Sequence, residues 1–310
     1  MSNANYKNLL DFTLREIHSI LEDIETILID CDGTLWHHNK PIPGTVDVFN
    51  TFKKSGKQLF MLSNNSTKTH VRIAEDARTM KYQVDNDHVL NTAYLTASFL
   101  NSEHFSKKVY IVGAMGISEE MESADIENFG AGPENTEVDF NSDLNHIEIQ
   151  PNVGAVVVGH DIHISYVKLI KATTYLKDSK CLFIGTSCDE RLPSTHESSL
   201  ILPGPGSLLE AIETASNREA FIIGKPHTYI HEYLVKNHNI NPRRTLIVGD
   251  SVTGDIEFGY KCGYTTLLVL TGDTTLDMLK STKKKLVVYP DFYVDSLGSL
   301  VKFFNRPRLS

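Results

Sequence analysis

Short apolar runs recur along the chain, and several of them stop at a cluster of polar residues. Four such runs lie at 26–29, 58–62, 220–223 and 245–248, and none of them alternates between apolar and polar positions. Runs of this kind are typical of strands buried on both faces of a parallel sheet. After the first run, Val46, Val48, Phe49 and Phe52 follow at helical spacing, and Gly56 ends that segment. The pattern therefore predicts an α/β fold built on a parallel sheet.

A long block between the second and third runs has an alternation of its own. Runs at 109–112, 154–158 and 181–184 read as strands, and 166–176 reads as the helix between the last two. We interpret this block as a second α/β domain inserted into the first. The predicted domains are 1–105 for the first part of the core, 106–216 for the inserted domain and 217–310 for the second part of the core.

Each of the four core runs is followed by polar side chains. These clusters contain Asp30, Asp32, Ser63, Asn64, Lys225, Asp250 and Asp255. Open α/β sheets bind their ligands at the carboxyl ends of the strands. We therefore expect these side chains to line one crevice.

The pair Asp30 and Asp32 carries the strongest chemical signal in the sequence. Two carboxylates one residue apart repel each other, and one pKa rises unless a metal ion or a shared proton compensates. A hard cation such as Mg²⁺ takes oxygen ligands and would hold both acids. The alternative is structural, with Asp32 and Gly33 serving as turn residues that close the strand.

Composition excludes several classes of partner. The chain has 310 residues, 41% of them hydrophobic, and a formal net charge of −9. We expect no nucleic-acid partner, because phosphate backbones are bound through basic surfaces, but a small phosphorylated molecule needs only a local cationic pocket. No apolar stretch reaches the roughly 20 residues of a membrane span, so we expect no membrane partner. The N-terminus lacks the apolar core of a secretion signal, and the four cysteines contain no Cys-x-x-Cys pair, so we expect a cytoplasmic protein with reduced thiols.

Taken together, the strand-end clusters contain the parts of a device for phosphoryl transfer. A carboxylate serves as nucleophile, Mg²⁺ bridges protein and phosphate, hydroxyl and amide groups hold phosphate oxygens, and a lysine offsets the developing charge. The clusters also resemble, in order, the four motifs of the haloacid dehalogenase superfamily of aspartate-dependent phosphatases. A closer resemblance, carried by 30–36, 63–69, 156–159, 165–169, 224–226 and 290–296, is to the eukaryotic phosphoglycolate phosphatase and 4-nitrophenylphosphatase group, which includes pyridoxal phosphatase.

The resemblance implies a Rossmann-like parallel-sheet core with a large α/β cap between the second and third motifs. It assigns Asp30 as the nucleophile that forms an aspartyl phosphate, and Asp32 as the acid and base that also lends its backbone carbonyl to Mg²⁺. Lys225 would stabilise the phosphoryl group and the nucleophile, and Asp250 would complete the metal site.

Further roles follow from the same resemblance. Ser63 and Asn64 would hold the phosphoryl group, and Asp255 would orient Lys225 or metal-bound water. Relatives often carry an additional Asp where Thr253 stands, and we expect metal binding to survive this change.

The cap loop at 185–193 is the predicted specificity element, with Asp189, Arg191 and Leu192 over the leaving group. Arg191 is the candidate partner of a substrate carboxylate, while a salt bridge from Arg191 to Asp189 or Glu190 is the alternative. Ser187 departs from the pattern of the relatives.

We therefore expect a Mg²⁺-dependent phosphomonoesterase acting on phosphoglycolate-like metabolites and on 4-nitrophenyl phosphate. One alternative keeps the chemistry with pyridoxal phosphate or a phosphoprotein as substrate, and another is a weakly active paralogue that serves as a binding protein. The resemblance also implies a homodimer that pairs through the cap.

Overall fold

The computed structural model describes residues 6–136, 147–192, 200–281 and 287–304. Backbone packing divides the chain into two compact units. The core unit comprises Met1–Ser63, Val71–Leu90 and Lys225–Ser310, and the second unit comprises Asn64–His70 and Asn91–Gly224. The second unit is wider than the block predicted from 106 to 216, and the assignment of that block as a cap stays a prediction.

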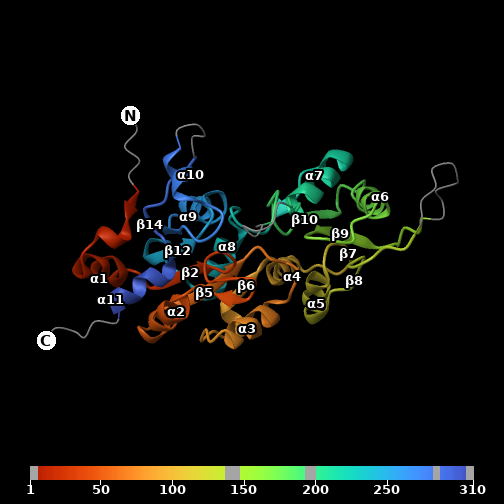
Figure 1. Cartoon of the computed structure of the whole chain (residues 1–310). Coiled ribbons are helices and arrows are strands. Elements are labelled where there is room, and N and C mark those ends of the chain that lie inside the picture. Colours follow the sequence, from red (N-terminus) through yellow and green to blue (C-terminus); the bar gives the residue numbers. More distant parts are fainter. Residues whose placement is uncertain (1–5, 137–146, 193–199, 282–286, 305–310) are drawn as a thin grey trace. The chain divides into compact units, whose positions relative to one another are not determined.

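Within the described residues, the core unit contains a seven-stranded sheet (Figure 1). Its order is β1 (Lys7–Asn8), β14 (Phe292–Val294), β13 (Thr265–Val269), β12 (Thr245–Gly249), β2 (Thr26–Asp30), β5 (Gln58–Ser63) and β6 (Val89–Asn91). Every residue of β2 is buried, as its uninterrupted apolar run predicts. β2 pairs in parallel with β5 on one side and β12 on the other, and the strand order reverses there. Such a reversal marks the point at which open α/β sheets bind ligands.

Helices and short turns complete the core unit. The α-helices are α1 (Leu14–Glu22), α2 (Thr45–Lys54), α3 (His70–Thr79), α8 (Tyr229–His238), α9 (Glu257–Cys262), α10 (Leu276–Lys280) and α11 (Val301–Phe304). Val48, Phe49 and Phe52 of α2 are buried, as their helical spacing predicts. A two-stranded antiparallel hairpin, β3 (Trp36–His37) and β4 (Lys40–Pro41), follows the end of β2. Single 3₁₀ turns lie at Leu9–Asp11, Asn86–His88, Pro242–Arg244 and Leu297–Leu300.

The part of the second unit that the structure describes contains a parallel five-stranded sheet of its own. The strand order is β11 (Phe221–Ile222), β10 (Leu182–Gly185), β9 (Val153–Val158), β7 (Lys108–Val112) and β8 (Asn128–Phe129). Its α-helices are α4 (Thr92–Ser102), α5 (Met115–Ser123), α6 (Tyr166–Tyr175) and α7 (Pro205–Ser216). α6 and α7 pack against each other and against β9 (Figure 1). The strands and the helix expected in this block are therefore present, and the α/β fold class is confirmed.

One predicted core strand belongs to the other sheet. The run 220–223 was expected to end in the core crevice, but β11 pairs with β10, with Ile184 opposite Phe221 and Gly185 opposite Ile222. A short apolar run indicates burial, but it does not select between two sheets. Lys225 consequently does not follow a core strand, and instead begins the segment in which the chain re-enters the core unit.

Candidate active site

A tight turn after β2 sets the position of the first acid. Asp30 is the last residue of the strand, and the carbonyl of Cys31 accepts backbone N–H groups from Leu35 at 2.9 Å and Trp36 at 3.2 Å. Gly33 has a φ of +84°, and a Cβ atom there would lie 2.6 Å from Oδ2 of Asp250. Glycine is therefore required at this position by both the backbone conformation and the approach of Asp250.

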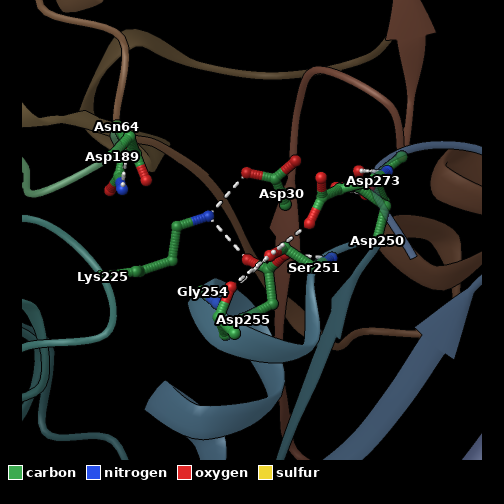
Figure 2. A network of polar contacts seen from close by, with 11 residues as sticks. Asp30, Asn64, Asp189, Lys225, Asp250, Ser251, Gly254, Asp255 and Asp273 are labelled. Carbon is green, nitrogen blue, oxygen red and sulfur yellow. Dashed lines mark hydrogen bonds and ion pairs between the residues drawn. The ribbon is translucent and has the colours of Figure 1, made fainter. Parts of the chain in front are cut away.

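Lys225 joins two acids in the buried centre of the site. Its Nζ donates to Oδ1 of Asp30 at 2.5 Å and to Oδ1 of Asp255 at 2.7 Å (Figure 2). Only 4% of the Lys225 side chain and 2% of the Asp255 side chain are exposed. Because a buried ion needs both a counter-charge and hydrogen bonds, this geometry keeps Lys225 charged. The two carboxylates raise the pKa of Lys225 even though burial acts to lower it.

Asp250 lies beside this pair and is held from two sides. Thr34 Oγ1 donates to its Oδ1 at 3.4 Å, and the backbone N–H of Asp273 donates to its Oδ2 at 2.6 Å. β12 ends at Gly249, and a π-helical turn, Val252–Ile256, then brings Asp255 back towards the strand end. The backbone N–H of Ser251 donates to Oδ2 of Asp255 at 3.2 Å and fixes its carboxylate.

The carboxylates outnumber the cations in this cluster. One ligand oxygen from each of Asp30, Asp250 and Asp255 lies within 4.8 Å of the others. Burial, followed by repulsion from Asp255, raises the pKa of Asp250 to about 7. Burial also raises the pKa of Asp30 well above its usual range, against the attraction of Lys225. Three acids and one lysine leave a deficit of positive charge, and hard oxygen donors fit a divalent cation such as Mg²⁺. The described residues therefore contain an acidic cluster able to bind a metal ion.

This group of acids differs in one member from the predicted metal set of Asp30, Asp32 and Asp250. The side chain of Asp32 is exposed, and its Oδ1 accepts a hydrogen bond of 3.1 Å from Nε1 of Trp36. The sequence pattern predicted a cation that holds both acids, and the family resemblance implied a metal contact through the backbone carbonyl of Asp32. Both metal contacts of Asp32 stay predictions. Two acids one residue apart thus have opposite environments, since Asp30 is buried and Asp32 faces solvent.

Ser63 and Asn64 mark the passage from one unit to the other. Ser63 is the buried last residue of β5, and Asn64 is the first residue of the second unit. Within the second unit, Asn64 Nδ2 donates to Oδ2 of Asp189 at 3.0 Å (Figure 2). Thr92 Oγ1 donates to the Asn64 carbonyl at 2.9 Å. Asn64, which was predicted to bind phosphate, is therefore in contact with Asp189, which was predicted to set substrate specificity.

Backbone contacts join the predicted specificity loop to residues 202–204. Leu192 N–H donates to the carbonyl of Leu202 at 2.9 Å, and Arg191 forms an antiparallel bridge with Pro203. Gly204 packs so closely that a Cβ atom there would lie 2.1 Å from the Asp189 carbonyl oxygen. Among the described residues no ion pair joins Arg191 to Asp189 or Glu190, and Pro193 at the end of the loop lies outside them.

Several residues that shape the site were not singled out from the sequence. Thr34 and Asp273 contact Asp250, and a Cβ atom at Gly272 would lie 1.9 Å from Asp250 Oδ2. The available signal was the polar string 271–275, which is separated from β13 by Leu270 alone. A polar cluster that contains Gly and lies near the end of a strand of the core sheet indicates a further loop at the carboxyl edge of that sheet, where the site lies.

Comparison with known proteins identifies the family. A family model for haloacid dehalogenase-like hydrolases matches residues 27–127, and a second, HAD-hydrolase-like model matches residues 222–300. A Homo sapiens protein named glycerol-3-phosphate phosphatase is 38% identical over 298 residues, which cover 91% of this chain and 92% of that protein. The chain belongs to the haloacid dehalogenase-like hydrolases. Family membership and the predicted class of enzyme, a phosphoric monoester hydrolase, are thereby confirmed.

Two further similarities agree with this assignment. The chain is 31% identical over 311 residues to phosphoglycolate phosphatase 1A of Arabidopsis thaliana, covering 97% of this chain and 83% of that protein. The structure resembles that of p-nitrophenyl phosphatase from Archaeoglobus fulgidus, with a TM-score of 0.77, 27% identity, and coverage of 90% of this chain and 99% of the other. No helix among the described residues is long and apolar enough to cross a membrane.

Proposed function

We propose that this chain is a Mg²⁺-dependent phosphomonoesterase that hydrolyses small phosphorylated metabolites through an aspartyl phosphate on Asp30. The observation that carries the proposal is the contact of Lys225 with both Asp30 and Asp255 beside Asp250. A carboxylate at a strand end that is hydrogen-bonded to a charged lysine can act as a nucleophile, because Lys225 favours its ionised form against the burial that raises its pKa.

The carboxylates of Asp30 and Asp250, with the backbone carbonyl of Asp32, would hold the cation. When bound, Mg²⁺ would neutralise charge on the phosphoryl oxygens and lower the pKa values of the acids that contact it. Lys225 would stabilise the same oxygens and keep Asp30 ionised. Ser63 and Asn64 would orient the phosphoryl group through their hydroxyl and amide.

The chemistry divides into two displacements at phosphorus. A carboxylate oxygen of Asp30 forms a bond to phosphorus, the bond to the leaving oxygen breaks, and Asp32 gives its proton to that oxygen. Water then attacks the aspartyl phosphate while Asp32 takes a proton from it, and the bond between Asp30 and phosphorus breaks to release inorganic phosphate. The exposure of Asp32 supports this role, because a general acid and base must exchange protons with solvent and leaving group.

The substrate is proposed to be a short hydroxylated or carboxylated phosphate ester. Relatives of this chain are named for glycerol 3-phosphate and for phosphoglycolate, and the chain is more similar to the human protein of the first name than to the Arabidopsis thaliana protein of the second. Asp189, Arg191 and Leu192 would discriminate among leaving groups.

Phosphate release from a panel of esters tests the proposal. The panel contains glycerol 3-phosphate, phosphoglycolate, pyridoxal phosphate, a phosphoserine peptide and 4-nitrophenyl phosphate, each with Mg²⁺ and with excess chelator. We expect the first two and the aryl phosphate to be hydrolysed only with Mg²⁺. Preference for pyridoxal phosphate or the peptide would change the substrate class, and no release above that of an Asp30→Asn preparation would favour the binding-protein alternative.

The predicted homodimer and cytoplasmic location stay predictions. Light scattering coupled to size exclusion measures the mass in solution, and a mass of one chain at micromolar concentration would contradict the dimer. Fractionation of cells expressing the tagged protein tests the location.

A further inference from the structure

The segment after β13 wraps around Asp250. Thr271 Oγ1 donates to the carbonyl of Gly33 at 2.6 Å, and the backbone N–H of Thr274 donates to the Asp250 carbonyl at 3.0 Å. Between them, the N–H of Asp273 contacts Oδ2 of Asp250 at 2.6 Å. The segment thereby fixes the backbone and one carboxylate oxygen of a proposed cation ligand.

The side chain of Asp273 places a fourth acid beside this cluster (Figure 2). Its Oδ2 accepts a hydrogen bond of 3.2 Å from Ser251 Oγ, and Ser251 is the residue that follows Asp250. The same hydroxyl lies 3.4 Å from Oγ1 of Thr253. Asp273 is exposed, so its carboxylate lies on the solvent side of the buried acids Asp30 and Asp250.

We propose that Asp273 is a positioning residue of the cation site, which orients Asp250 through its N–H and adds negative charge on the solvent side through its carboxylate. The inference rests on the proposed function, because it concerns the cation of that site. Ser251 holds the Asp273 carboxylate in place. Thr253 contacts the same hydroxyl, so the loop after β12 and the loop after β13 both bring a side chain to Ser251.

Direct measurement of cation affinity tests the role of Asp273. Calorimetric titration with Mg²⁺ alone, in the absence of substrate, compares the wild type with Asp273→Asn and with Asp277→Asn. Asp277 is an exposed acid on the next helix and serves as a matched control. Asp273→Asn keeps the backbone N–H that contacts Asp250 and removes only the exposed carboxylate charge. We therefore expect Mg²⁺ binding to weaken by about fivefold in Asp273→Asn and by less than about twofold in the control.

Two further measurements separate positioning from a general structural effect. The deficit of Asp273→Asn is expected to shrink as ionic strength rises, because the charge is exposed and screened. Adding Thr253→Asp to Asp273→Asn is expected to restore most of the Mg²⁺ affinity, since it returns a carboxylate to the Ser251 hydroxyl. The cation-induced rise in melting temperature is an independent readout of the same affinities.

The outcomes distinguish the two proposals. If the wild type binds no Mg²⁺, the cation in the proposed function is overturned, and the role of Asp273 falls with it. If the wild type binds Mg²⁺ and Asp273→Asn binds it equally well, only the role of Asp273 is overturned. Equal losses in both single variants, or no rescue by Thr253→Asp, would also overturn it.

Discussion

Lys225 Nζ donates a hydrogen bond of 2.5 Å to Oδ1 of Asp30, although 195 positions separate the two residues in the sequence. The whole second unit lies in the chain between them. Lys225 is the first residue of the core unit after that excursion, so the contact ties the end of β2 to the point at which the chain returns. The catalytic chemistry proposed for Asp30 depends on this hydrogen bond to Lys225.

Replacing Lys225 with Met is expected to destabilise the protein and abolish phosphate release. The change leaves the carboxylates of Asp30 and Asp255 buried without their shared cation. Breaking a buried ion pair by removing one partner typically costs about 3–5 kcal/mol. Urea unfolding in chelator measures the free energy of unfolding, and the malachite green assay measures phosphate.

A double variant provides the control for this prediction. Lys225→Met combined with Asp255→Asn removes one of the two buried carboxylates that would lack a cationic partner, so the free energy of unfolding is expected to recover in part. Activity is not expected to return, because Asp30 still lacks its cationic partner. A single variant as stable as the wild type would show that the contact contributes nothing to folding.

The cation-free protein is expected to lose stability as pH rises from about 4 to about 7 through the titration of Asp250. Its pKa is raised from 3.8 to about 7 in the folded state, first by burial and then by repulsion from Asp255. Between these values the folded state binds a proton that the unfolded state has lost, so the free energy of unfolding falls with rising pH. Above about pH 7 both states are ionised and this contribution is constant.

The variant Asp250→Asn isolates that contribution. Urea unfolding of both proteins in chelator, across this pH window, is expected to show the wild type losing stability relative to the variant. Because a cation binds the ionised acid, the affinity of the wild type for Mg²⁺ is expected to rise over the same window. A stability difference that does not depend on pH would contradict the raised pKa.

The sequence predicted the parts of the site that lie at the ends of long buried strands. Asp30, Ser63 and Asp250 each follow an apolar run of β2, β5 or β12, and these strands are neighbours in one sheet. The apolar run alone was enough to place them, because parallel strands deliver their carboxyl ends to one edge.

Other parts depended on contacts that no local pattern encodes. β11 belongs to the second sheet because it pairs with β10. That pairing depends on a contact between segments distant in sequence, which the apolar run at 220–223 does not encode. Asp273 reaches Asp250 because β13 pairs with β12, with Leu268 opposite Gly249, so that the loops after both strands meet. The sequence showed Asp273 only as one residue of a polar turn.

Replacing Asp30 with Asn is expected to abolish turnover while the fold persists. The amide keeps the shape of the carboxylate and removes the attacking charge, and a missing covalent nucleophile is not replaced by binding alone. Phosphate release is expected to fall by several orders of magnitude. Because the substitution would also relieve repulsion among the buried acids, the melting temperature in chelator is expected not to fall. Activity within about tenfold of the wild type would rule out the nucleophile.

Replacing Arg191 with Ala is expected to lower the hydrolysis of a carboxylated substrate more than that of substrates without a carboxylate. The backbone of Arg191 is held in its bridge to Pro203, and within the described part of the chain its guanidinium forms no ion pair with Asp189 or Glu190. A guanidinium that is not committed to a protein acid can hold a substrate carboxylate with two hydrogen bonds. The value of kcat/KM for phosphoglycolate is therefore expected to fall by about tenfold or more, since hydrogen bonds to charged groups contribute about 1.5–3 kcal/mol.

Two substrates without a carboxylate serve as references for Arg191→Ala. Hydrolysis of 4-nitrophenyl phosphate and of glycerol 3-phosphate is expected to stay within about twofold of the wild type, because the chemical step uses Asp30 and Lys225 and not the cap. Arg191→Lys keeps the charge but lacks the planar fork, so it is expected to recover phosphoglycolate hydrolysis only in part. Equal losses on all three substrates would assign Arg191 a structural role in the loop, and unchanged kinetics on all three would remove it from the site.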